Sequence, residues 1–142
     1  MIARRVGWLL PVVALLTMGM GDMGLTGGDD IPPWPSRNFA GTVTDRTLVV
    51  LHVDHINCEG HTAIKAYLGE MEIQVPFETI AAIEFSPGTA EAVWGQVELR
   101  NGKTDKMRFR GNTRCYAKSE LGSLKVKIQN LKSIKFDSPP PP

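Results

Sequence analysis

The sequence lacks the short motifs that would identify a catalytic reaction. None of its serines lies in a G-x-S-x-G turn, which holds the nucleophile of many hydrolases. It has no C-x-x-C-H segment for covalent haem attachment and no glycine-rich phosphate-binding loop. It also has no long stretch with the apolar spacing of an amphipathic helix. We therefore expect a non-catalytic protein that requires no cofactor.

The N-terminal segment has the layout of a secretion signal. Arg4 and Arg5 precede an apolar stretch over residues 6–20, and glycines follow it. This stretch is shorter than the ~20 apolar residues that cross a bilayer, so we expect a signal peptide over residues 1–21 rather than a retained anchor. The sequence then predicts an exported protein, periplasmic or extracellular, that meets the membrane only during export.

The rest of the chain divides into three parts by composition. Residues 22–38 are rich in glycine and proline and predict a linker, and residues 137–142 form a proline-rich tail. Residues 39–136 lie between them and have the length of one small domain, which can bury a core without a metal ion or several disulfides.

Short apolar patterns separated by turn residues predict an all-β fold for this domain. Residues 47–53 are apolar on both faces, which is typical of a buried central strand. Residues 70–75 alternate between apolar and polar, as in a half-buried strand. Residues 62–68 suit either a strand or a helical turn, and the pattern alone leaves both open.

Asn101-Gly102 is a strong signal for a β-hairpin. It lies between two strand patterns, over residues 93–99 and 106–110. We expect a bulged three-residue loop that places Val97 opposite Met107, because that register keeps the apolar face continuous.

Two stretches of the chain end alike. The same offsets hold Val75, Phe77, Ile80, Ile83 and Phe85 in one stretch and Val126, Ile128, Leu131, Ile134 and Phe136 in the other. This pattern predicts tandem repeats over residues 39–85 and 93–136, with Cys58 and Cys115 at equivalent positions. Since units of ~45 residues are too small to bury a core alone, we expect a pseudo-twofold pair packed as one sandwich or barrel-like domain.

Three phrases of the sequence carry a family resemblance. They are Gly41-Thr-Val, Ile73-Gln-Val-Pro-Phe-Glu-Thr-Ile-Ala-Ala-Ile-Glu-Phe and Gly122-Ser-Leu-Lys-Val-Lys-Ile-Gln-Asn-Leu-Lys-Ser-Ile-Lys-Phe. Residues 39–136 thereby resemble a group of small exported bacterial proteins whose tandem β-units end in a G-x-x-x-I-P-x-x-x-I-x-x-I-x-F phrase. The resemblance implies duplication and export, and it implies no activity or catalytic residue.

The chain has two cysteines, Cys58 and Cys115. In an exported protein such a pair predicts one disulfide bond. The alternatives are a pair of buried thiols or one free thiol awaiting a partner, because a sequence does not establish the ~5.5–6 Å separation between Cα atoms that a bridge requires.

A second candidate site is a metal site at His52, His55, Cys58 and His61, where the spacing is H-x-x-H-x-x-C-x-x-H. Imidazole and thiolate groups are common ligands of zinc and other transition metals. On a strand, however, His52 and Cys58 point one way and His55 and His61 the other. A metal-binding or redox-linked envelope protein is therefore the alternative function.

Charge is divided unevenly along the chain, although the net charge is only +1. Residues 39–85 carry two basic and seven acidic residues, which is −5, whereas residues 93–136 carry eleven and three, which is +8. We expect a cationic sheet face at Lys106, Arg108, Arg110, Lys125 and Lys127, on adjacent strands. Such a face attracts an anionic envelope polymer, and the two charged halves favour self-association or a protein partner.

Aromatic residues make up 7% of the chain, and few lie among these basic residues. Base stacking on aromatic rings supports single-strand binding, so we expect no specific nucleic-acid partner. The leading function predicted from the sequence is an interaction or structural module of the cell envelope or extracellular space, self-assembling through its acidic and basic halves.

Overall fold

The computed structural model describes residues 31–142, and the predicted signal peptide lies outside these described residues. Residues 31–142 form ten strands and two short 3-10 helices. The strands are β1 (Gly41–Asp45), β2 (Val50–Cys58), β3 (Ala63–Leu68), β4 (Met71–Pro76), β5 (Ile80–Phe85), β6 (Val93–Leu99), β7 (Thr104–Phe109), β8 (Arg114–Ser119), β9 (Gly122–Lys127) and β10 (Leu131–Phe136). The 3-10 helices are η1 (Phe77–Thr79) and η2 (Ile128–Asn130). The all-β prediction is confirmed, and none of the helices described here has the length and apolarity to cross a membrane.

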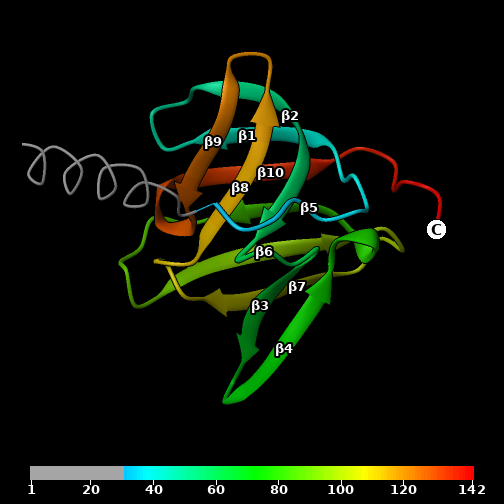
Figure 1. Ribbon diagram of the computed structural model, residues 1–142. Coiled ribbons are helices and arrows are strands. Elements are labelled where there is room, and N and C mark those ends of the chain that lie inside the picture. The colour runs from blue at the N-terminus through cyan, green and yellow to red at the C-terminus, as the bar shows by residue number, and fades with distance from the viewer. Residues whose placement is uncertain (1–30) are drawn as a thin grey trace, which may run out of the picture. The chain divides into compact units, whose positions relative to one another are not determined.

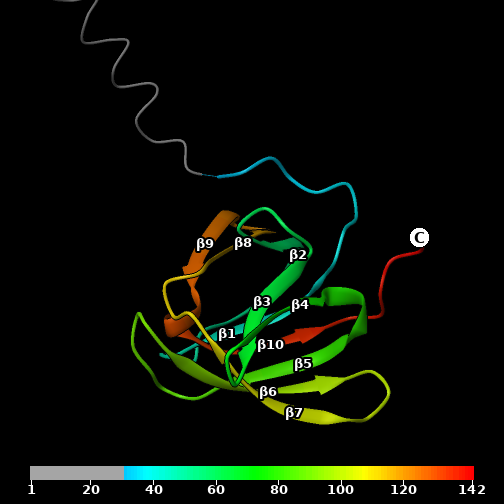
Figure 2. The same ribbon diagram turned by 90° about the horizontal axis from the view of Figure 1, so that it is seen from below.

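All ten strands belong to one antiparallel sheet, which curls around its core (Figures 1 and 2). The strand order is β4-β3-β7-β6-β5-β10-β1-β2-β8-β9. We call β4-β3-β7-β6-β5 the contiguous half, because its strands follow one another in the sequence. We call β10-β1-β2-β8-β9 the split half, because its strands come from both ends of the domain. Pairing between β5 and β10 joins the two halves.

Each copy of the repeated phrase forms the end of a strand, a 3-10 helix and a second strand. The first copy runs through β4, η1 and β5, and the second through β9, η2 and β10. Nine of the ten apolar positions that the copies share are buried, and Val126 is the half-buried exception. Phe77 joins the halves of the core, with its ring centroid 4.9 Å from that of Phe136 and 5.7 Å from that of Phe39. The phrase therefore marks the turns that close the core.

The start of β2 corrects one prediction. Residues 47–53 were expected to be a buried strand, but Leu48, Val49 and Val50 are 65%, 53% and 59% exposed. The reason is a tight turn held by Asp45, whose carboxylate accepts hydrogen bonds from the backbone N–H groups of Thr47 and Val49. Only after this turn does the chain enter β2, where it pairs with β1 and β8.

The hairpin of β6 and β7 has the expected loop length but a different register. The Leu99 N–H donates a hydrogen bond to the carbonyl of Lys103, so the three residues between them form the loop. Val97 faces Asp105, and Met107 faces Gly95, which corrects the predicted pairing of Val97 with Met107. A side chain at Gly95 would lie 2.7 Å from the Phe109 ring, so the glycine makes room for the core.

Cys58 and Cys115 do not occupy equivalent positions, contrary to the prediction. Cys58 ends β2, the second strand of residues 39–85, whereas Cys115 lies in β8, the third strand of residues 93–136. The two residues face each other because β8 pairs directly with β2 across the split half.

A candidate anion-binding groove

The candidate site lies where the chain passes from β2 in the split half to β3 in the contiguous half. A disulfide joins Cys58 to Cys115 at this point, with an S–S length of 2.08 Å and a Cα separation of 3.9 Å. Asn57, whose side chain is fully buried, accepts a hydrogen bond from the Gly60 N–H through its Oδ1 atom at 3.0 Å. These bonds hold the turn between β2 and β3 against β8, and the predicted disulfide is confirmed.

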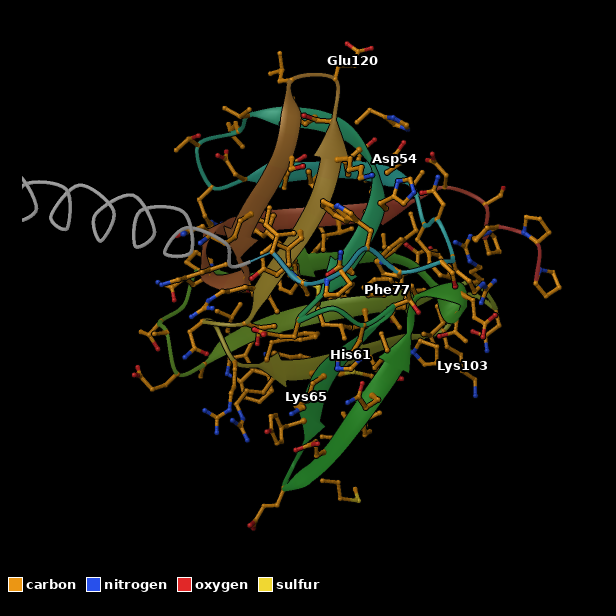
Figure 3. The ribbon with its side chains drawn as sticks, in the orientation of Figure 1. Asp54, His61, Lys65, Phe77, Lys103 and Glu120 are labelled. Atoms are coloured by element: carbon orange, nitrogen blue, oxygen red, sulfur yellow. A yellow bond between two sulfur atoms is a disulfide. The ribbon has the colours of Figure 1, made fainter. Side chains whose placement is uncertain are left out.

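A first cavity of about 450 Å³ lies beside this disulfide. Its basic walls are Lys65 from β3, Arg110 after β7 and Arg114 at the start of β8, with His61 nearby. Figure 3 places His61 and Lys65 close together on the side of the molecule where β3 lies. The first cavity therefore brings to one hollow two cations from strands β3 and β8 and one from the turn between β7 and β8.

A second cavity of about 550 Å³ lies next to the first, and Arg114 lines both. Its other basic residues are Arg46, Lys125 and Lys127. Arg46 has one guanidinium nitrogen bound to the carbonyls of Phe85 and Leu131, which fixes its position. We call the two cavities together the basic groove. Its six basic side chains are Arg46, Lys65, Arg110, Arg114, Lys125 and Lys127.

The basic groove contains two carboxylates, and both accept hydrogen bonds from backbone N–H groups. Glu59 accepts a hydrogen bond from the Arg114 N–H at 2.9 Å. Asp45 accepts from the N–H of Val49 and from the hydroxyl and N–H of Thr47, which lowers the pKa of its carboxyl group. These carboxylates leave the groove with an excess of four positive charges, from six basic and two acidic residues.

Ion pairing neutralises little of this charge. Lys65 lies 3.9 Å from Glu72 and forms an ion pair with it. Arg110, Arg114 and Lys127 are exposed and have no carboxylate partner among these residues. Cations that are exposed, clustered and unpaired raise the local concentration of anions.

The predicted cationic face is therefore divided. Arg110, Lys125 and Lys127 line the basic groove, but Lys106 and Arg108 do not. The strands that were expected to be adjacent, β7 and β9, lie in different halves of the sheet.

Lys106 and Arg108 lie over aromatic rings instead. The Lys106 ammonium is 5.3 Å from the Trp94 ring centroid, and the Arg108 guanidinium is 4.8 Å from the Tyr67 ring centroid. These contacts hold both cations on the outer face of the contiguous half.

The histidines do not gather into the predicted metal site. His52 lies 3.1 Å from Asp137, and His55 lies 2.8 Å from Asp54. His61 lines the first cavity, and the Cys58 sulfur is bonded to Cys115. No three His, Cys, Asp or Glu side chains of the described range lie close enough to share a metal ion. Bulging of β2 explains this separation, because His55 has a positive φ of 54° and its neighbours turn out of register.

Sequence reasoning missed three groove residues, Arg46, Lys65 and Arg114. Each comes from a different stretch of the chain. The pairing of β2 with β8 and of β3 with β7 brings Lys65 and Arg114 together, and backbone carbonyls of Phe85, Asn130 and Leu131 hold Arg46.

Comparison with known proteins gives one family. A family model described as "Uncharacterised protein" matches residues 35–138, which include every described strand and both 3-10 helices. No curated protein matches the sequence.

Proposed function

The chain belongs to a family of uncharacterised proteins, and from its own surface we propose that it is a non-catalytic, exported module that binds an anionic polymer of the cell envelope. The observation that carries this proposal is the basic groove, in which Arg114 lines two adjacent cavities. A ligand that spans both cavities must carry several negative charges along its length. An acidic polysaccharide has this chemistry.

The residues of the groove favour a polysaccharide over nucleic acid. No phenylalanine, tyrosine or tryptophan lines either cavity, and His61 supplies the one ring there. Single-stranded nucleic acids usually stack their bases on aromatic rings, whereas a chain of carboxylates needs only spaced cations and polar groups. Gln74, Asn112, Thr113 and Gln129 supply polar groups along the groove.

Export is supported by the disulfide. Bonds of this kind persist in the periplasm and outside the cell and are rare in the cytosol. Together with the charged and apolar segments of residues 1–21, the Cys58–Cys115 bond favours a protein that works in the envelope or extracellular space. A non-catalytic role agrees with the lack of a nucleophile motif in the sequence.

The tandem repeat is part of the same proposal. The strand order has an internal symmetry. If each strand of β1–β5 exchanges its place with the strand numbered five higher, the result is the same strand order read in the opposite direction. In both segments a 3-10 helix precedes the last strand. Gly41 faces Phe136 as Gly95 faces Phe85. These correspondences favour two repeats that exchange their hairpins, with β3–β4 paired to β7 and β8–β9 paired to β2.

The test is binding of the mature protein to polygalacturonate, with neutral dextran as the control polymer, measured by isothermal titration calorimetry. We expect binding to polygalacturonate that weakens as salt rises, and none to dextran. A triple variant Arg110→Glu, Arg114→Glu and Lys127→Glu should bind about tenfold to a hundredfold more weakly, at roughly 0.5–1 kcal/mol for each lost contact.

The matched control is Lys103→Glu, Lys106→Glu and Lys135→Glu, which changes the charge equally at exposed positions outside the groove. We expect this variant to keep most of its affinity. Equal losses in the two triple variants would show that overall charge, and not the groove, attracts the polymer. Equal binding of dextran and polygalacturonate would contradict the proposal itself.

A further inference from the structure

Within residues 31–142 the sheet has two ends that no other strand covers, β4 in the contiguous half and β9 in the split half. The two strands carry opposite charges on their exposed residues. Glu72 lies in β4 and Glu70 just before it, which we call the acidic edge. Lys125 and Lys127 lie in β9, which we call the basic edge. We propose that copies of this protein join acidic edge to basic edge, so that the sheet continues from one molecule to the next.

Strand direction permits this continuation. Neighbouring strands are antiparallel at every step of the sheet, and the sheet has an even number of strands, ten. A second copy placed with its β4 beside β9 therefore meets it in the antiparallel sense. An edge strand offers a row of unpaired N–H and C=O groups, and a second strand can satisfy them.

Side-chain alternation also matches across the proposed contact. In β4, Ile73 and Val75 face inward and Glu72 is exposed; in β9, Leu124 and Val126 face inward and the lysines are exposed. A strand pair that keeps apolar residues on one face must place Glu72 opposite an odd-numbered residue of β9. The two registers that pair most of both strands place it opposite Lys125 or Lys127.

Each edge lies beside an apolar hollow that a neighbouring strand could cover. The hollow at the acidic edge is about 510 Å³ and is lined by Ile73, Val75, Leu99 and Met107 among others. The hollow at the basic edge is about 190 Å³, and its apolar walls are Val43, Val49, Leu51, Leu124, Val126 and Leu131. Joining the edges would bury part of both hollows and remove apolar surface from water.

Charge selects between the possible pairings. Two acidic edges would bring glutamates together, and two basic edges would bring lysines together, so both symmetric pairings are disfavoured. Lysines on an edge strand commonly prevent unwanted pairing, and here they exclude the symmetric dimer while allowing the mixed contact. Figure 1 shows β4 at the bottom of the molecule and β9 at the top, so both edges can be occupied at once. A contact between different surfaces of identical copies need not close, and it generates an open chain of molecules.

The test exchanges the charges of the two edges. One variant carries Glu70→Lys and Glu72→Lys, and the other carries Lys125→Glu and Lys127→Glu. Sedimentation velocity of the wild type at low salt should show species that grow with concentration and shrink when salt is added. Each variant alone has charges of the same sign on both edges, so it should associate at least about tenfold more weakly than the wild type.

An equimolar mixture of the two variants should recover the association of the wild type. In the mixture each lysine-bearing β4 meets a glutamate-bearing β9, and each unchanged β4 meets an unchanged β9. A matched control, Glu98→Lys with Asp105→Lys, makes the same charge change on exposed residues of the β6–β7 hairpin and should associate like the wild type.

Several results would overturn the proposal. The wild type could stay monomeric at low salt up to its highest soluble concentration, or it could form a closed dimer that does not grow. The equimolar mixture of the two variants could also stay as dissociated as each variant alone. Glu70 and Glu72 do not line the basic groove, so their variant should still bind polygalacturonate. Loss of assembly with retained binding therefore separates this inference from the proposed function.

Discussion

The disulfide between Cys58 and Cys115 encloses the whole contiguous half, β3 to β7, because the two cysteines are 57 residues apart in the sequence. A bond that closes a loop of this length lowers the chain entropy of the unfolded state. The chain-entropy relation gives about 4 kcal/mol of stabilisation at 25 °C. We predict that the double variant Cys58→Ala and Cys115→Ala unfolds with a free energy about 3–5 kcal/mol lower than that of the wild type.

Alanine is the suitable replacement because both cysteines are buried, with 2% and 3% exposure, and a buried serine would add an unpaired hydroxyl. The assay is urea denaturation followed by far-UV circular dichroism, with and without a phosphine reductant. The reductant should lower the stability of the oxidised wild type to near that of the double variant, and it should leave the double variant unchanged. A difference below about 1 kcal/mol would refute the reasoning, since it would mean that the unfolded chain is no more restricted with the bond than without it.

Two further predictions concern single side chains. Phe77→Ala should lower the free energy of unfolding by about 3–5 kcal/mol, because the Phe77 ring is fully buried between Phe39 and Phe136, and urea denaturation measures this loss; an effect below about 1 kcal/mol would mean that the core does not depend on this ring. The lowered pKa of Asp45 means that its ionised form stabilises the fold above the pKa it has in the unfolded chain, and that this stabilisation is lost as pH falls through its lower pKa in the folded protein. Melting temperatures of the wild type should therefore fall on acidification below about pH 4 more steeply than those of Asp45→Asn, and parallel curves would contradict this role.

Local patterns in the sequence predicted the strands well. Alternation over residues 70–75 identified β4, and the shared phrase identified ten apolar positions, nine of which are buried. These features depend on neighbours within a few residues, so the sequence contains the information that decides them.

Features that depend on distant residues were not predictable in the same way. Residues 48–50 were predicted to lie in a core strand, because their apolar character does not reveal that Asp45 turns them outward. The facing of Cys58 and Cys115 and the meeting of Lys65 with Arg114 require the pairing of β2 with β8 and of β3 with β7. These strands are far apart in the sequence, and no local pattern specifies which of them pair.

The division of the sheet into a contiguous and a split half has a consequence for the order of folding. In the proposed export, an unfolded chain would emerge from the membrane N-terminus first, so β1 and β2 would reach the far side before the strands that complete their half. The contiguous half is complete once β7 has emerged, whereas the split half must wait for β8, β9 and β10. During this interval β2 has one unpaired side, and contacts between strands so far apart in sequence form slowly. We expect the contiguous half to form first and to hold Cys58 near the place where Cys115 arrives.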